Sequence, residues 1–224
     1  MQKTKKTTYS SFASTEMLNQ YVIQRLVQAI DHNPQANIIL SGGNTPRPIY
    51  EGFNALGTQS KDCSFVPSDE RRVSVNHKLS NEGMIRGYLK EYDSSQILSL
   101  QDPGIYNQLR EIPTYDFSLL GMGQDGHFAS IFPEMDNLEE AVSSGSSLCM
   151  VDAGYPDVPR ISLTLKEMLK SKKTILLVTD EKKLRLFERA LHSPNETPIS
   201  KLIESTQSLE VCLLKKHEPI TSGN

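Results

Sequence analysis

The chain has 224 residues, 37% of them hydrophobic, and its 24 Lys and Arg against 27 Asp and Glu give a formal net charge of −3. This length is sufficient for a full hydrophobic core, and since no low-complexity linker divides the sequence, we expect a single domain over residues 1–224. The slightly acidic balance contains no basic block large enough for a nucleic-acid footprint, which argues against a nucleic-acid partner.

No apolar run approaches the ~18 residues needed to span a membrane, and residues 1–6 are not followed by the apolar core of a signal peptide. We therefore expect no membrane partner, and we interpret residues 1–11 as a flexible tail. Cys63, Cys149 and Cys212 are widely spaced and match no disulfide or metal motif. This pattern is typical of a reducing compartment, so we expect a cytoplasmic protein with no metal site.

Near the amino terminus, apolar residues recur at intervals of three and four over residues 15–30. This spacing predicts an amphipathic helix, which Ser14 or Thr15 can cap. The short apolar run at residues 36–40 then predicts a buried strand. Pro46 suits the first turn of the helix that follows, because its missing N–H has no partner there in any case.

The turn between this strand and this helix has the sequence SGGNTP, residues 41–46. An isolated Gly-Gly pair is more often simple loop punctuation. Here, however, free backbone N–H groups and the positive end of a helix dipole meet at one point, which favours an anion. The turn is neither a P-loop nor a dinucleotide fingerprint. We expect a phosphate group to bind at Gly42, Gly43, Asn44 and Thr45.

The apolar run at residues 63–66 predicts a second strand, which ends in the charged cluster DERR at residues 69–72. Taken alone, such a cluster is typical of a solvated, mutually paired surface. In a parallel sheet, however, it would lie at the same edge as the Gly-Gly turn. A further helix is predicted from Ser80, and residues 93–113 are interpreted as mostly loop.

The central stretch, residues 115–133, has the sequence YDFSLLGMGQDGHFASIFP. Its apolar run predicts a strand that stops in Gly-Met-Gly, and the glycines carry Asp125 and His127 through a tight turn. A single histidine more often has a structural or surface role. Its position in a turn at the end of a buried strand favours a functional one, because open α/β sheets place their sites there.

The second half of the chain continues the alternation. Residues 135–147 predict a short helix with a loop, residues 148–151 a strand, and residues 159–165 alternate apolar and polar side chains. The clearest buried strand covers residues 173–179. It is followed by a helix over residues 180–191 and a last strand over residues 209–214.

Strands that alternate with helices predict βαβ units. We therefore expect an α/β fold, a three-layer α/β/α arrangement with a mostly parallel, Rossmann-like sheet. Lys182 lies in the first turn of the helix at residues 180–191, where a cation opposes the helix dipole. Such a lysine is equally consistent with ligand binding and with a solvated surface.

Together, these turns resemble those of the 6-phosphogluconolactonases over about residues 12 to 205. The element Gly-Met-Gly-x-Asp-Gly-His is typical of the wider superfamily that also contains the glucosamine-6-phosphate deaminases. The resemblance rests on SGGNTP at residues 41–46, DER at 69–71, SN at 80–81, GMGQDGH at 121–127 with FP at 132–133, PRISLT at 159–164, and Lys182. It implies hydrolysis of 6-phospho-D-glucono-1,5-lactone to 6-phosphogluconate, in the oxidative branch of the pentose phosphate pathway. The expected partner is therefore a small phosphorylated sugar lactone, and the oligomeric state stays open.

Two positions separate the branches of this superfamily. Deaminases carry a glutamate directly before the proline that closes the Gly-His segment, where this chain has Phe132, and they favour an aromatic residue where it has Arg71. Both differences favour the lactonase. The alternatives are a sugar-phosphate isomerase or deaminase that uses Asp69 as a carbon base, and a non-catalytic sugar-phosphate sensor. The sensor is disfavoured because the chain starts almost directly on its first helix.

Lactone hydrolysis needs an activated water, a donor for the carbonyl oxygen and a proton for the departing ring oxygen. A neutral His127 can take the proton from water and return it to the leaving oxygen, and the resemblance implies the same residue. Asp125 is expected to orient a polar partner or the substrate, and Asp69 to hold substrate hydroxyls. Arg71 is the candidate for stabilising the carbonyl oxygen or the product carboxylate.

The 6-phosphate of such a substrate is expected on the glycine turn at residues 42–45. Arg160 and Lys182 are expected to supply positive charge there, so that an acidic chain can bind an anion through local donors. No step of this reaction requires a metal ion or an organic cofactor.

Overall fold

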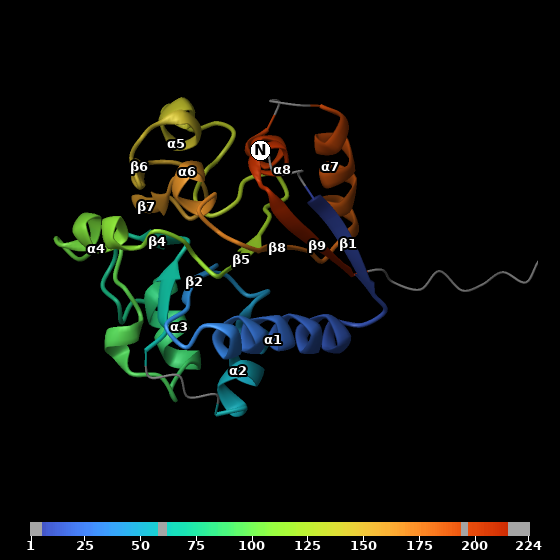
Figure 1. Cartoon of the computed structure of the whole chain (residues 1–224). Coiled ribbons are helices and arrows are strands. Elements are labelled where there is room, and N and C mark those ends of the chain that lie inside the picture. Colours follow the sequence, from blue (N-terminus) through green and yellow to red (C-terminus); the bar gives the residue numbers. More distant parts are fainter. Residues whose placement is uncertain (1–5, 58–61, 194–196, 215–224) are drawn as a thin grey trace, which may run out of the picture.

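The computed structural model describes residues 6–57, 62–193 and 197–214. Its main sheet has six strands, each parallel to its neighbours (Figure 1). Their spatial order is β1 (Lys6–Phe12), β9 (Ser208–Leu214), β8 (Thr174–Val178), β5 (Phe117–Gly121), β2 (Asn37–Leu40) and β3 (Ser64–Pro67).

Helices cover both faces of this sheet (Figure 1). One face packs against α1 (Thr15–His32), α2 (Arg47–Ala55) and α3 (Asn81–Tyr88). The core on the other face includes residues of α4 (Ile105–Glu111), α5 (Leu138–Ser143), α6 (Leu165–Met168), α7 (Glu181–His192) and α8 (Pro198–Ser205). The predicted α/β fold with a mostly parallel sheet between helices is therefore confirmed.

Successive residues of the central strands enter different cores. In β2, Ile38 and Leu40 pack with α1, α2 and α3, whereas Ile39 belongs to the core of the opposite face. This alternation follows from the two-residue period of a strand. Because both faces are covered, a central strand is apolar throughout and carries no polar alternation. The run Ile38-Ile39-Leu40 has this character.

A second, smaller sheet stands beside the carboxyl ends of the main strands. Its order is β4 (Asp69–Arg71), β7 (Arg160–Leu163) and β6 (Leu148–Val151), and its strands are antiparallel. Only Ser68 separates β3 from β4, so the chain passes from one sheet directly into the other. The sequence predicted the strand character of residues 148–151 and 159–165 but not a separate sheet, because the pairing joins segments far apart in the chain.

Two segments correct the sequence analysis. Residues 6–11, expected in a flexible tail, belong to β1 and pair with β9 from Lys6 opposite Ser208 to Phe12 opposite Leu214; residues 1–5 lie outside the described part. An edge strand of this kind has no signature until its neighbour is known. Residues 93–113, expected to be mostly loop, contain a short 3₁₀ helix, η1 (Ser94–Gln96), and α4.

The helices predicted at residues 15–30, after Pro46, from Ser80 and at residues 180–191 are present as α1, α2, α3 and α7. Ser14 caps α1 by accepting a hydrogen bond from the backbone N–H of Met17. Among the described residues, no helix has the length and apolar character needed to cross a membrane.

One buried carboxylate ties the edge of the main sheet to α1. Glu210 of β9 is 3% exposed and accepts hydrogen bonds from the hydroxyls of Ser10 and Tyr21, and Lys173 Nζ lies 2.8 Å from its Oε2. Burial raises the pKa of Glu210, but the bonds from Lys173, Tyr21 and Ser10 outweigh this effect, so its pKa lies below the ordinary 4.5. The ionised form therefore stabilises the fold.

We expect Glu210→Gln to lower the free energy of unfolding by about 2 kcal/mol at neutral pH, because it weakens the charge-assisted hydrogen bonds to a buried carboxylate, whereas the side chain of Lys173 is 33% exposed and stays solvated. The contribution of Glu210 is present above its unfolded pKa and is lost as the pH falls through its lowered folded pKa. The variant should therefore lose less stability than the wild type during acidification. Urea unfolding from neutral pH down to about pH 3.5 measures both effects. The exposed Glu188→Gln is the control, and parallel pH curves for Glu210→Gln and the wild type would refute the role.

Candidate active site

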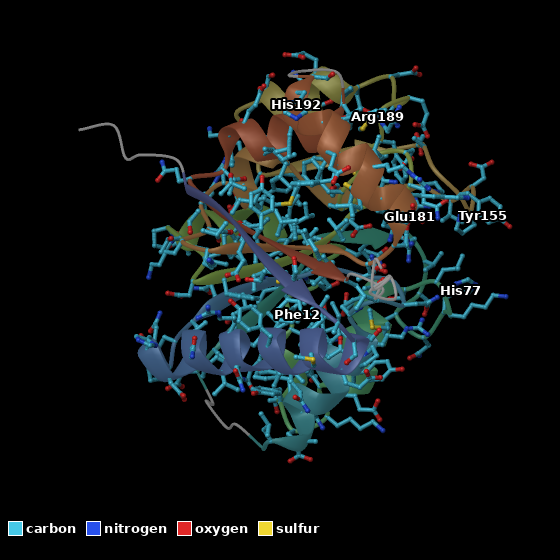
Figure 2. All side chains as sticks on the ribbon, turned by 90° about the vertical axis from the view of Figure 1, so that its right-hand side faces the viewer. Phe12, His77, Tyr155, Glu181, Arg189 and His192 are labelled. Carbon is cyan, nitrogen blue, oxygen red and sulfur yellow. The ribbon has the colours of Figure 1, made fainter. Side chains whose placement is uncertain are left out.

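A cavity of about 340 Å³ opens at the carboxyl ends of β2, β3 and β5. In Figure 2 this end of the strands lies on the right, where α7 begins at Glu181 and where Tyr155 and His77 project outward. The cavity is lined by Ser41, Gly42, Gly43, Asn44, Thr45, Pro46, Ser68, Asp69, Arg71, Asn81, Gly121, Met122, Gly123, His127, Ala129 and Lys183.

His127 follows β5 and lies partly exposed in this cavity. Its Nδ1 is 2.6 Å from Oδ1 of Asp125, which itself does not line the cavity. Burial raises the pKa of Asp125, but hydrogen bonds from the ring and backbone of His127 outweigh this, so the net shift is downward. An ionised Asp125 makes Nδ1 the protonated nitrogen and leaves Nε2 as the acceptor. A Cβ at Gly123 would stand 2.2 Å from the imidazole, so the turn needs glycine there.

Asp69 of β4 forms another part of the wall and is 5% exposed. Its two carboxylate oxygens accept hydrogen bonds from Ser68 Oγ at 3.0 Å and from Ser130 Oγ at 2.6 Å. These bonds fix the orientation of the carboxylate and partly satisfy its need for donors. They also connect β4 to the segment that follows His127.

The neighbouring Glu70 points away from the cavity and caps the first turn of α3. Its carboxylate accepts hydrogen bonds from Ser80 Oγ and from the backbone N–H groups of Arg71, Asn81 and Glu82, at 2.6 to 2.9 Å. A carboxylate suits the positive end of a helix dipole. Burial nevertheless outweighs these bonds and raises the pKa of Glu70. The contact holds β4 against α3.

Arg71 and Asn81 are held together by this arrangement. The NH1 group of Arg71 donates to the backbone carbonyl of Leu79 and to Oδ1 of Asn81, at 3.0 and 2.7 Å. Asn81 Nδ2 donates to the carbonyl of Asp69 at 2.9 Å. The Nε of Arg71 is buried and has no hydrogen-bond partner within the described ranges. Because Arg71 as a residue lines the cavity, its guanidinium keeps donor capacity that these protein contacts do not use.

The glycine turn between β2 and α2 forms the adjoining part of the wall, next to Asn81. Gly43 has a φ of +88°, and α2 begins without a side-chain cap. The Oγ of Ser41 is buried, and it too has no partner in the part of the chain that the structure describes. A wall of this kind offers backbone and hydroxyl donors at a helix amino terminus, where an anion is favoured.

The structure does not bring every predicted residue to this cavity. Seven of the predicted residues line it: Gly42, Gly43, Asn44, Thr45, Asp69, Arg71 and His127. Asp125 does not line it but contacts His127 Nδ1 through its carboxylate. Lys182 lines a different cavity on the outside of α7, and Lys183 takes the place expected for it. Asp180 accepts the hydrogen bond from the backbone N–H of Lys183, and the Nζ of Lys183 lies 3.7 Å from Asp180 Oδ2.

Arg160 does not line the cavity either. It is 2% exposed, and its Nε and NH2 groups donate to the backbone carbonyls of Ala153 and Pro156. Its guanidinium lies 5.3 Å from the ring centre of Phe132. Burial and the nearby Arg71 lower the pKa of Arg160, while Asp69 acts in the opposite direction. These bonds tie Arg160 to the loop between β6 and β7.

The sequence analysis missed Lys183 and Asn81. The cap at Asp180 was a usable signal for Lys183, because it fixes which side of the first turn faces the strand ends. Asn81 was identified as part of a helix start and of the SN motif at residues 80–81, but no role in the site was predicted for it. Among the described residues, no group of three or more His, Cys, Asp or Glu side chains is arranged to hold a metal ion.

Comparison with known proteins gives consistent results. The family described as glucosamine-6-phosphate isomerases/6-phosphogluconolactonase matches residues 10–211. A 6-phosphogluconolactonase of Neisseria meningitidis serogroup B is 28% identical over 203 residues, which cover 84% of this chain and 88% of the relative. The crystal structure of a 6-phosphogluconolactonase from Shewanella baltica superimposes with a TM-score of 0.86 at 25% identity, covering 94% and 99% of the two chains.

A monomeric glucosamine-6-phosphate deaminase also has this fold. Its TM-score is 0.79 at 16% identity, and 93% of this chain and 98% of the deaminase are covered. The fold alone therefore does not distinguish a lactonase from a deaminase, and the distinction depends on the side chains at the site.

Gly42→Ala tests the packing of the cavity wall. A Cβ at this position would stand 2.0 Å from Oδ1 of Asn81, so the amide must give up its bonds to Arg71 and Asp69. We expect a loss of about 2 kcal/mol in the free energy of unfolding, as for other overpacked sites. In the control Gly87→Ala, on exposed α3 surface with nothing within 4 Å, stability should rise by about 0.5–1 kcal/mol. Urea unfolding measures the stability of both variants. If Gly42→Ala is as stable as the wild type, the close packing of Gly42 against Asn81 is contradicted.

Proposed function

The chain belongs to the glucosamine-6-phosphate isomerase/6-phosphogluconolactonase family, and we propose that it hydrolyses 6-phosphogluconolactone with His127 as the general base. The observation that carries this proposal is the 2.6 Å contact between His127 Nδ1 and Asp125. It leaves Nε2 as the basic nitrogen of a histidine that lines the cavity. The substrate class follows from the named relatives.

In the proposed reaction, Nε2 of His127 takes a proton from water while the water oxygen attacks the lactone carbonyl carbon. The bond between this carbon and the ring oxygen then breaks, and the imidazolium returns its proton to the departing oxygen. The products are a hydroxyl and a carboxylic acid, which ionises in solution. Asp125 is a positioning residue that also stabilises the imidazolium, since its lowered pKa keeps it charged.

Negative charge develops on the carbonyl oxygen as water adds. We assign its stabilisation to Arg71, because this guanidinium lines the cavity and keeps donor capacity that its bonds to Leu79 and Asn81 do not use. The bonds of NH1 to Leu79 and Asn81 hold the group in place before the substrate arrives. Asp69 accepts hydrogen bonds from substrate hydroxyls at the same wall.

The 6-phosphate is proposed to bind at the turn of residues 42–45, where α2 begins without a side-chain cap. Lys183 supplies the positive charge, since it lines the cavity and Lys182 does not. Arg160 is left out of this subsite because its guanidinium is buried against Phe132 and donates to two loop carbonyls. Local donors are thus sufficient for phosphate binding in a chain of net charge −3.

Both sheets and helices of both layers contribute to this one site, which supports a single functional domain over residues 1–224. Cys63, Cys149 and Cys212 are buried, and burial raises the pKa of each thiol to about 11 or 12. Protonated, buried thiols outside any disulfide motif favour a reducing compartment, and we propose the cytoplasm.

A deaminase or isomerase is the second candidate, because Asp69 places a buried carboxylate in the cavity wall. Both oxygens of Asp69 already accept hydrogen bonds from serine hydroxyls, and Phe132 stands where deaminases carry a glutamate. Incubation with glucosamine 6-phosphate, followed by measurement of ammonia, tests this candidate directly. Ammonia release at a turnover comparable to lactone hydrolysis would replace the lactonase proposal.

We expect His127→Ala to lower kcat by roughly 10²–10⁴-fold, the usual contribution of a positioned base. The lactone is generated in situ from glucose 6-phosphate, and its disappearance is compared for wild type, variant and buffer alone. His192→Ala, at the end of α7, is the matched control and should keep wild-type activity. Near-normal turnover of His127→Ala would remove His127 from the mechanism.

Lys183 and Lys182 form a matched pair for the phosphate subsite. Lys183→Met is expected to raise KM for the phosphorylated lactone by roughly tenfold, as loss of one charge-assisted bond would, with little change in kcat. Lys182→Met should leave both parameters unchanged, since this side chain lies outside the cavity. With unphosphorylated gluconolactone as substrate, the two variants should have the same KM. An increase in KM for Lys182→Met alone would restore the assignment made from the sequence.

A further inference from the structure

Phe132 returns to contact His127 after a tight turn. The backbone N–H of Ile131 donates to the carbonyl of Phe128 at 2.9 Å, and Ala129 between them has a φ of +49°. This turn brings the ring of Phe132 to 4.4 Å from the imidazole of His127, measured between ring centres, with 42° between the planes. Phe132 is 4% exposed. The imidazole therefore lines the cavity on one side and packs against an aromatic ring on another.

Phe132 is itself held by the loop between β6 and β7. A Cβ at Gly154 would stand 2.2 Å from the Cζ of Phe132, so the ring lies directly against the glycine backbone. Arg160 places its guanidinium 5.3 Å from the ring centre and is fixed by bonds to Ala153 and Pro156 of the same loop. The ring of Phe132 has little freedom to move away from His127.

We propose that Phe132, held by Gly154 and Arg160, is a positioning residue for the imidazole of His127. This inference rests on the proposed role of His127 as the base. Asp125 fixes Nδ1 through a hydrogen bond, and the backbone of Gly123 lies against the Cε1 and Nδ1 atoms, so both restraints act on one edge of the ring. Packing of Phe132 against the ring supplies a further restraint, and together they direct Nε2 toward the cavity.

The geometry also explains why this position carries phenylalanine. The ring atom nearest to a Cβ added at Gly154 is Cζ, the atom that carries the hydroxyl in tyrosine, so the larger side chain would crowd the loop at Gly154. A leucine would fill part of the volume but has no flat ring to restrain the imidazole. Arg160 gains a role in this arrangement: it closes the pocket around Phe132 from the β7 side.

The test uses Phe132→Leu and Gly154→Ala with two matched controls. Gly57→Ala also replaces a glycine of positive φ, but nothing lies within 4 Å of its added Cβ. Phe53→Leu removes a buried ring from the core on the other face of the sheet. For Phe132→Leu and Gly154→Ala we expect kcat to fall by roughly tenfold or more, as for other small misplacements of a catalytic group, with KM within about twofold of wild type. The controls should keep wild-type kcat.

A second measurement observes the contact without turnover. The imidazole C–H signals of His127, assigned by their disappearance in His127→Ala, are shifted by the ring current of Phe132 in the wild type. They should move in Phe132→Leu and Gly154→Ala and stay in place in both controls. Phe132→Met, which better preserves core volume, replaces Phe132→Leu if that variant is unfolded at the assay temperature, as judged by circular dichroism.

The outcomes separate this inference from the proposed function. Unchanged His127 signals together with wild-type kcat in folded Phe132 and Gly154 variants would overturn the positioning role, whatever His127→Ala shows. Full activity of His127→Ala would overturn the role of the base, and with it the inference. Displaced His127 signals with a reduced kcat and an unchanged KM, in both variants and in neither control, would support the positioning role.

Discussion

The carboxylate of Glu70 determines the geometry of one wall of the site. It occupies the amino terminus of α3 and accepts the hydrogen bonds that this helix start would otherwise leave unmade. The residues on either side of it, Asp69 and Arg71, thereby face the cavity, and the first residue of α3, Asn81, connects them. One buried carboxyl group with no role in the chemistry thus fixes three polar groups that line the cavity.

The electrostatics of the site depend on which charged and polar groups already have hydrogen-bond partners within the protein. Glu70 accepts hydrogen bonds from three backbone N–H groups and the hydroxyl of Ser80, and Asp69 from two serine hydroxyls, so neither presents a bare carboxylate to an incoming anion. Two of the buried donors that have no hydrogen-bond partner in the described ranges, Arg71 Nε and Ser41 Oγ, belong to residues that line the cavity. A protein of net charge −3 can therefore present a locally electropositive surface to a phosphorylated ligand.

Local patterns in the sequence were sufficient to predict the main sheet, the glycine turn and the turn that carries His127. They were insufficient wherever a partner distant in the chain decides the outcome. Strand β1 depends on β9, and the burial of Arg160 depends on Phe132. The difference between Lys182 and Lys183 has another origin: neighbouring residues of a helix point about 100° apart, so a shift of one position changes which cavity the side chain lines.

The pairing of β1 with β9 has a consequence for the order in which the molecule forms. Lys6 lies opposite Ser208, so β1 can complete its pairing only after a segment far later in the chain has been made. The sheet edge at β1 therefore cannot close before β9 is available. A pairing of such large sequence separation is also entropically costly to form. Until then, the exposed edge of β9 and the unpaired β1 segment are the parts of the chain most open to association with other unfolded chains.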